Sequence, residues 1–365
     1  MKARLGDVCT VVSGSTPKST VPEYWDGDIK WITPAELSND TYIINDSARH
    51  ITALGVAKTG LKSFPAGTVI LSSRAPIGKT AIAGCEMFCN QGFKNLICSE
   101  KIDSKYLYYF LSGKTDYLNS LGRGATFKEI SKAIVENIEI PLPEVEEQKR
   151  IAARFERLLR LIQLQKAELE ELDKLVKSRF IELFGNYDLT HPQESWAPIK
   201  EVGTVVGGAT PKTDHDEYWG GSYRWITPAE LDADSGYIYD SVRKLTKAGV
   251  ESCSLQEMPV GTVILSSRAP IGKVAIAGNT FYCNQGFKNI ICKEGITPRY
   301  LYTVLLLNVE YLNSLGRGAT FKEISKGIVE SIRIPVPSME LQEQFAAFVE
   351  QTDKSKLCGT MEVAA

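Results

Sequence analysis

The stretch NSLGRGATFKEISK spans residues 119–132 and is repeated letter for letter at residues 313–326. The offset between the copies is 313 minus 119, or 194 residues. Solenoid repeats are only about 20–50 residues long, so a period of this size predicts a duplicated globular domain. Three further stretches return at the same offset: WITPAEL from Trp31, VILSSRAPIGK from Val69 and CNQGFKN from Cys89.

Length and composition predict a globular protein without membrane spans. A chain of 365 residues favours two to three domains. Its 43% apolar and 24% charged residues are typical of soluble proteins. We find no run of 18 apolar residues and no apolar signal segment in MKARLGDVCT. We therefore expect a cytoplasmic protein with no membrane partner, whose eight cysteines are reduced. Buried core thiols are favoured over a zinc site, because Cys85 and Cys89 form a spaced pair in the first copy only.

Between the copies, residues 144–185 predict one long helix. Pro143 precedes it and Gly185 follows it, as expected at helix boundaries. Apolar residues recur at alternating steps of four and three, which is the seam of a coiled coil. A helix of this length extends about 60 Å at 1.5 Å per residue, and it needs a partner helix to bury its seam. The predicted seam contains Ile151, Phe155, Leu158, Ile162, Leu169, Leu172 and Val176.

Residues 338–357 are the candidate partner helix. At the offset of 194, Phe345 matches Ile151 and Val349 matches Phe155, so both join the predicted seam. The final residues CGTMEVAA are expected to form a frayed tail. Antiparallel pairing would place the two globular domains at opposite ends of a rod, related by a pseudo-two-fold axis. The expected parts are a first domain at 1–143, the central helix at 144–185, a second domain at 186–337, and a distal helix with its tail at 338–365.

Within each copy, the sequence predicts mixed α/β structure. GTVILSS and GKTAIAG are expected to form a strand pair around a turn at residues 74–78, and GFKNLICS a further strand. SKYLYYFLSGKTDYLNSL predicts one helix. Trp31 and Trp225 are interpreted as core residues rather than stacking platforms.

The repeated stretch also predicts a phosphate contact. Thr126 and Glu129 have the spacing of a capping box for the helix that follows. Free N–H groups at a helix start, with Arg123, Lys128 and Lys132 nearby, suit a phosphate. The alternative is a capped helix with solvated charges. The same loop on two bodies favours binding, because it could hold one polymer at two points.

Two other motifs are candidate contacts. In SSRAPIGK, Arg74 and Lys79 flank a hairpin turn, and the alternative is a structural hairpin with solvated charges. The loops SGSTPKS and GGATPKT carry Thr and Lys side chains, but they do not match a nucleotide-binding loop.

Catalysis has little support in the sequence. The three histidines, His50, His191 and His215, do not recur in the other copy. We find no P-loop, no zinc-protease motif and no dinucleotide fingerprint. The repeated residues are Gly, Thr, Arg, Lys, Asn and aromatics, which suit recognition. Two other classes stay open: a stand-alone bivalent DNA-binding protein, and an enzyme with a cryptic site such as a fused nuclease.

The repeated motifs, and above all the run from IPLPEVEEQ into the long helix, resemble the specificity subunit of a Type I restriction–modification system. The resemblance implies an α+β fold: two similar mixed α/β target recognition domains, separated by long antiparallel coiled-coil helices in a pseudo-two-fold internal repeat. Each domain would read one half of a bipartite site in double-stranded DNA. The helices would dock modification (methyltransferase) subunits, and a restriction/translocase subunit would cut unmodified DNA. This chain would be non-catalytic and hold no cofactor or metal, with S-adenosylmethionine bound by the methyltransferase.

With DNA as the expected ligand, the candidate contact residues come in pairs from the two copies. They are Thr16, Lys18, Arg74, Lys79, Lys94, Arg123, Thr126, Lys128, Thr210, Lys212, Arg268, Lys273, Lys288, Arg317, Thr320 and Lys322.

Two departures from the family pattern add expectations. The two domains are near copies, so the half-sites should be near-identical on opposite strands, with centres about 10 bp apart if both are read from one face of the duplex. Residues 164–184 of the central helix have no counterpart after Leu357. This favours either a truncated distal helix or coverage of the exposed seam by another chain.

Overall fold

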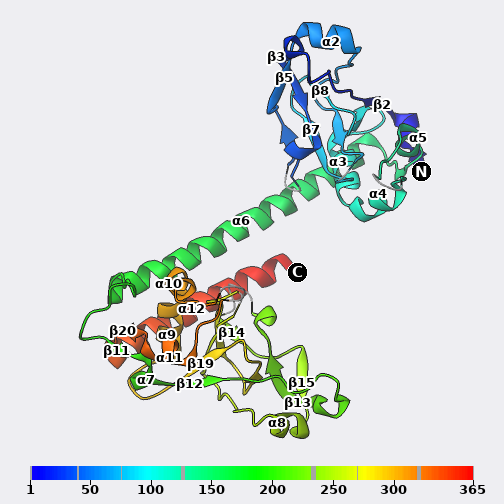
Figure 1. Cartoon of the computed structure of the whole chain (residues 1–365). Helices are drawn as coiled ribbons and strands as arrows, with labels where there is room; N and C mark the ends of the chain where they lie inside the picture. The colour runs from blue at the N-terminus through cyan, green and yellow to red at the C-terminus, as the bar shows by residue number, and fades with distance from the viewer. Residues whose placement is uncertain are drawn as a thin grey trace. The chain divides into compact units, whose positions relative to one another are not determined.

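Figure 1 shows the computed structural model, which describes residues 2–38, 41–74, 76–124, 128–231, 236–268, 270–318 and 322–364. The chain divides into two compact units, Met1–Leu164 and Gln165–Ala365. Among the described helices, none is long and apolar enough to cross a membrane.

A five-stranded mixed sheet forms the centre of the first unit. Its order is β2 (Cys9–Ser13), β9 (Lys94–Cys98), β6 (Val69–Leu71), β7 (Thr80–Ala83) and β4 (Ile43–Ile44). Neighbouring strands are antiparallel except β4 and β7, which run parallel. Because β6 and β7 are buried on both faces, all their residues except Thr80 are apolar. Val69 and Leu71 face one cluster and Ile70 faces the other. The predicted strand pair and the predicted strand in GFKNLICS are confirmed.

A second sheet of three strands lies in the same unit, in the order β5 (Arg49–Ile51), β3 (Trp25–Ile32) and β8 (Phe88–Cys89). Trp31 is only 2% exposed and packs edge-on against Trp25, so its prediction as a core residue is confirmed. The remaining short elements are β1 (Lys2–Arg4), α1 (Leu5–Val8), η1 (Pro22–Tyr24), η2 (Pro34–Glu36), α2 (Ala53–Thr59) and β10 (Glu139–Pro141), which pairs with β1.

The helix predicted over residues 104–121 is two helices. α3 (Ser104–Ser112) packs on β6 and β7, and α4 (Thr115–Leu121) follows it. The break falls at Gly113 and Lys114, where glycine is a poor helix residue. A third helix, α5 (Lys132–Glu136), follows the repeated stretch.

The second unit repeats this architecture. Its five-stranded sheet has the order β12-β19-β16-β17-β14 and its three-stranded sheet the order β15-β13-β18. Trp225, the counterpart of Trp31, is also 2% exposed. The elements are β11 (Ala197–Pro198), α7 (Ile199–Val202), β12 (Gly203–Gly207), η3 (Asp216–Tyr218), β13 (Trp219–Ile226), η4 (Pro228–Glu230), β14 (Tyr237–Ile238), β15 (Arg243–Leu245), α8 (Lys247–Ser252), β16 (Val263–Leu265), β17 (Val274–Ala277), β18 (Tyr282–Cys283), β19 (Lys288–Cys292), α9 (Pro298–Leu307), α10 (Val309–Ser314), α11 (Lys326–Ser331) and β20 (Arg333–Ile334).

The predicted long helix is present as α6 (Val145–Phe184), and the distal helix is α12 (Met339–Ala364). Within the second unit, the two helices pair antiparallel. Phe180 of α6 contacts Phe345 of α12, while Asp173, two turns earlier, forms an ion pair with Lys356. The expected frayed tail is wrong, because α12 continues to Ala364. Its last residues contain no proline and a single glycine, so nothing in them stops a helix.

The predicted seam is only partly buried. Leu169, Leu172 and Val176 are half-buried, and Phe345 and Val349 are buried. Phe155, Leu158 and Ile162 are exposed by 46%, 51% and 37%. Near the end of α6 the buried residues are Phe180 and Phe184, which pack on Tyr300 of α9 as well as on α12. A two-helix seam pattern does not anticipate this contact with a third helix.

Candidate nucleic-acid interface

Four loop segments lie side by side in the first unit: residues 14–18, 73–78, 90–92 and 123–130, with 75 and 125–127 outside the described residues. We call this group the loop edge. Backbone hydrogen bonds join its members: Ser15 N–H donates to the Cys89 carbonyl, Ser73 N–H to the Gly92 carbonyl, and Ile130 N–H to the Ser73 carbonyl. The loop edge is therefore a continuous, hydrogen-bonded layer rather than a set of separate loops.

The segment 73–78 is a shaped turn at the end of β6. The Ser72 hydroxyl donates to the Pro76 carbonyl at 2.7 Å and accepts from the Lys79 N–H at 2.9 Å. The Asn119 side chain donates to the Ile77 carbonyl at 3.2 Å. The repeated stretch 119–132 thus begins by fixing the turn that carries Arg74.

The repeated stretch then closes a small loop beside that turn. The backbones of Arg123 and Glu129 exchange two hydrogen bonds, at 3.0 and 2.9 Å. Gly124 has a φ of 128°, which other residues adopt only with strain. The side chains of Arg123 and Lys128 are exposed on the outside of this loop.

Two side chains hold the segment 14–18 in place by hydrogen bonds. The buried indole of Trp31 donates to the Ser15 carbonyl at 3.0 Å, and the Thr16 hydroxyl donates to Gln91 Oε1 at 2.5 Å. A Cβ atom at Gly14 would lie 2.0 Å from the Cys89 carbonyl oxygen, so only glycine allows this approach. Lys18 stays exposed.

The side chain of Glu129 forms ion pairs with Arg74, on the segment 73–78, and with Lys94 of β9. Its Oε2 accepts from Arg74 Nε at 2.8 Å, and its Oε1 accepts from Lys94 Nζ at 3.1 Å. Burial favours a higher pKa for this carboxyl, but the hydrogen bonds from Lys94 and Arg74 outweigh it and hold the pKa of Glu129 below its usual value. The carboxylate is therefore charged at neutral pH.

The second unit has the same loop edge with near-identical geometry. Glu323 accepts from Arg268 at 2.8 Å and from Lys288 at 3.0 Å. Thr210 donates to Gln285 at 2.6 Å. The remaining exposed candidates are again arranged on the outside: Lys212, Arg317 and Lys322.

The predicted capping box is wrong, because the helix that it was expected to cap begins later in the chain. α5 begins at Lys132 with Ser131 as N-cap, whose hydroxyl accepts from the Ile134 N–H. The Glu129 side chain is bound to Arg74 and Lys94 instead. Because α5 begins at Lys132, Lys128 lies before the helix and not on its first turn. Thr126 and its counterpart Thr320 lie outside the described residues.

The lysines of two predicted pairs are at least half-buried, and their ammonium groups bind other parts of the protein. The ammonium group of Lys79 donates to the Leu37 carbonyl, and that of Lys273 to the Leu231 carbonyl. Lys94 is 6% exposed and its ammonium group also reaches Ser73. Lys288 repeats these contacts in the second unit. These four lysines hold loops in place, while the exposed candidates remain predictions as DNA contacts.

Sequence reasoning missed three supports of the loop edge: Gln91, Asn119 and the pairing role of Glu129, with their counterparts Gln285, Asn313 and Glu323. All lie in stretches repeated without change at the offset of 194. Identity between the copies was thus a usable signal. The partner of each side chain was not visible, because Arg74 and Glu129 are 55 residues apart in sequence.

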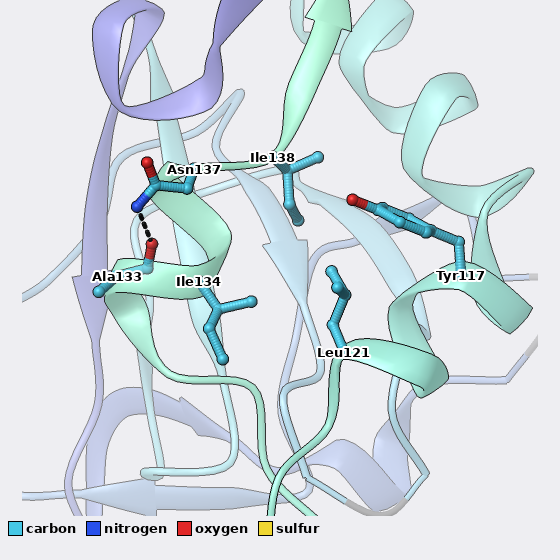
Figure 2. Close-up of a pocket in the computed structure, with 6 residues that line it drawn as sticks. All are labelled: Tyr117, Leu121, Ala133, Ile134, Asn137 and Ile138. Atoms are coloured by element: carbon cyan, nitrogen blue, oxygen red, sulfur yellow. Dashed lines mark hydrogen bonds between the residues drawn. The ribbon is translucent and has the colours of Figure 1, made fainter.

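A shallow pocket of about 270 Å³ lies next to the loop edge, between α4 and α5 (Figure 2). Tyr117 and Leu121 line it from α4, and Ile134 and Asn137 from the α5 side. The Asn137 side-chain amide donates to the Ala133 carbonyl at 2.7 Å. The lining is therefore mainly apolar, and it adds no charged group to the edge.

The cysteines next to the loop edge are core residues. Cys89 and Cys283 are buried, and burial raises the pKa of each thiol to about 12. This confirms the prediction of buried thiols at these two positions. Among the described residues, no cluster of three or more His, Cys, Asp or Glu side chains could hold a metal ion.

Comparison with known proteins places the chain among relatives of one kind. It is 42% identical over 185 residues to the Type I restriction enzyme MjaIX specificity subunit of Methanocaldococcus jannaschii, covering 49% of this chain and 43% of that protein. The MjaVIII specificity subunit of the same organism is 24% identical over 387 residues, covering 96% of this chain and 85% of the relative. The chain thus spans less than half of the first relative and most of the second.

A solved structure shares the fold. It was described for complex assembly and conformational transition of the type I R-M system, and it matches with a TM-score of 0.64 at 19% identity, covering 100% of this chain and 93% of the other. The sequence model for the Type I restriction modification DNA specificity domain matches residues 1–174 and 194–358. Two matched domains that together span most of the chain show that it belongs to the Type I restriction modification DNA specificity domain family.

Proposed function

We propose that this chain is the non-catalytic DNA-recognition subunit of a Type I restriction–modification complex. Its two loop edges would each bind one half of a bipartite site in double-stranded DNA. The observation that carries the proposal is the repetition of the loop edge, with the same exposed cations and the same hydrogen bonds, in both units. Exposed cations held on a hydrogen-bonded layer suit a polyanion, because each neutralised phosphate releases counterions.

The long helix would dock the modification subunits of the complex. The first-unit part of α6 carries a row of exposed apolar side chains, which is the composition of an uncovered protein contact. Phe155, Leu158, Leu159 and Ile162 belong to this row. The partner methyltransferase would bind S-adenosylmethionine, and a restriction/translocase subunit would join the same complex in the cytoplasm.

A selection experiment tests the DNA part of this proposal. The purified full chain, with and without its methyltransferase partner, is incubated with a library of duplexes that carry a randomised central region. We expect recovery of a motif with two short halves separated by unspecified bases. Recovery of no motif in either form, with binding no stronger than that of an unrelated acidic protein, would refute DNA recognition.

The helix part is tested by assembly. Leu158→Asp places a charge in the exposed apolar row and should weaken the complex with the methyltransferase, as measured by size-exclusion chromatography. Ala167→Asp, at an exposed position on the opposite face of the same helix, is the charge-matched control. Equal assembly of both variants and the unaltered chain would contradict docking at this row.

A further inference from the structure

The pairing of Arg74 with Glu129 leaves half of the arginine unused. A guanidinium group has five N–H donors in a fixed planar fork. Among the residues that the structure describes, Glu129 Oε2 accepts from Nε of Arg74 and from no other nitrogen of its guanidinium group. No described residue accepts a hydrogen bond from either terminal nitrogen, and the Arg74 side chain is 45% exposed. The two terminal nitrogens lie at the end of the guanidinium away from its Nε, so they are available to a ligand.

Charge balance does not require this arginine. Lys94 is buried against the other oxygen of Glu129, so the carboxylate already has a cationic partner in the interior. A partly exposed Arg–carboxylate pair adds little to stability. Yet the Arg–Glu contact recurs in the second unit at the same 2.8 Å. A repeated contact of small stabilising value is better explained by the orientation it gives to the arginine.

We propose that Glu129 and Glu323 are positioning residues that hold Arg74 and Arg268 by Nε, so that the terminal nitrogens of each arginine present a fork to two adjacent acceptors on DNA. This inference rests on the proposed DNA-recognition function and assigns a specific contact within it. The acceptor pair is either O6 and N7 of a guanine or two oxygens of one phosphate, both of which match the fork. Because the arginine is ordered before binding, less side-chain freedom is lost on contact.

The direction in which DNA affinity changes, when a negative charge is removed, distinguishes a positioning role of the glutamates from a purely electrostatic one. Glu129→Gln with Glu323→Gln removes one negative charge from each loop edge, which by itself would strengthen binding to every duplex. If Glu129 and Glu323 position the arginines, the double variant should instead bind the selected duplex more weakly. Affinity for the duplex selected by the unaltered chain should fall by roughly 10- to 100-fold, the usual value of a bidentate contact. Affinity for a scrambled duplex of the same composition should stay equal or rise if the acceptor is a guanine, and should fall as well if it is a phosphate.

A second pair of variants avoids any disturbance of the buried lysine. Arg74→Lys with Arg268→Lys keeps the charge but removes the fork, so affinity for the selected duplex should fall. If the acceptor is a guanine, discrimination against the scrambled duplex should be lost as well. Arg4→Lys with Arg150→Lys is the charge-matched control, because these arginines are exposed and lie outside both loop edges. The control should keep its discrimination within about twofold. Unchanged affinity for the selected duplex in the Arg74 and Arg268 variant would overturn the proposal.

Modified duplexes identify the acceptor. Replacing the guanines of the selected duplex by 7-deazaguanine removes the N7 acceptor. A guanine contact predicts weaker binding by the unaltered chain and no further loss from the lysine variant. A phosphate contact predicts no effect of the base change and a full loss from the lysine variant. If the unaltered chain selects no duplex at all, the proposed function fails as well. If it selects a motif that the variants bind with unchanged affinity, only the fork fails.

Discussion

Gln148 and Gln342 occupy equivalent positions in the two units, 194 residues apart, and each is fully buried. Gln148 donates to the carbonyl groups of Lys101 and Pro143 and accepts from the Asp103 N–H at 2.8 Å. Gln342 repeats all three bonds. Each glutamine therefore fastens the first turn of a long helix to the loop before α3 or α9.

Gln148→Ala and Gln342→Ala should each destabilise the unit that contains them. The substitution leaves two buried carbonyls and one N–H without partners, and each unpaired buried group costs about 1–3 kcal/mol. Thermal unfolding by calorimetry measures the loss. Gln351→Ala, on an exposed position of α12, should change little. Equal melting temperatures of all three variants would contradict the anchoring role.

Paired substitution of exposed cations tests the phosphate contacts. Arg123→Ala with Lys128→Ala, or Arg317→Ala with Lys322→Ala, should weaken binding to all duplexes alike. The slope of log affinity against log salt should fall by about one for each lost contact. Lys101→Ala, an exposed lysine beside the start of α6, serves as control. An unaltered slope in both double variants would remove these residues from the interface.

Phe180→Ala should be among the most destabilising changes in α6. Phe180 is 2% exposed and contacts Tyr300, Phe345 and Phe184. Truncating a buried phenylalanine costs about 3–5 kcal/mol. Leu164→Ala, at a position 58% exposed in the same helix, should cost little in the isolated chain. Urea unfolding followed by circular dichroism distinguishes the two, and similar midpoints would show that the aromatic cluster is not a stabilising core.

The ion pairs of Glu129 and Glu323 predict an acid-sensitive component of stability. Both carboxyls have a pKa below their usual 4.5, since Lys and Arg hydrogen bonds outweigh the effect of burial. A lowered pKa in the folded state contributes stability above the unfolded value, and this contribution is lost as pH falls through the folded value. Glu129→Gln with Glu323→Gln should therefore flatten the fall in the urea midpoint below pH 4.5.

Glu146→Gln is the control for this pH dependence. The Lys149 hydrogen bond also lowers the pKa of Glu146, but that pair is fully exposed and screened by solvent. Its acid profile should match that of the unaltered chain. An equal flattening in both variants would mean that exposed pairs, and not the loop-edge carboxylates, govern the acid response.

The near-identity of the loop edges predicts related half-sites. Two copies of the same reader should select near-identical sequences on opposite strands, so the target should approach an interrupted palindrome. The segments that differ, STVPEYWDGDIK against TDHDEYWGGSYR, leave room for a mismatched position. Methylation mapping of DNA treated with the reconstituted methyltransferase reads the motif directly. Two halves without inverted similarity would show that the differing segments choose the bases.

Much of the architecture was predictable, because it depends on local patterns. The duplication, the strands β6, β7 and β9, and the helix at 144–185 all follow from repeat offset and periodicity. The break at Gly113, the shift of the buried face to Phe180 and the extension of α12 were missed, since each depends on tertiary contacts or on weak stop signals. At the loop edge, residue type was visible, but the inward direction of Lys79 depends on the carbonyl of Leu37, which lies far away in sequence.

The positions of the tryptophan side chains make ligand binding measurable by fluorescence. Four of the five tryptophans donate their indole N–H to carbonyl groups at or beside the segment 14–18 and its counterpart: Trp25, Trp31, Trp219 and Trp225. Indole emission is sensitive to the polarity and hydrogen bonding around the ring. Any ligand that displaces these loops should therefore alter the intrinsic fluorescence of the chain, with Trp196 as a constant background. Each unit carries its own optical reporter, and no attached dye is needed to follow docking in real time.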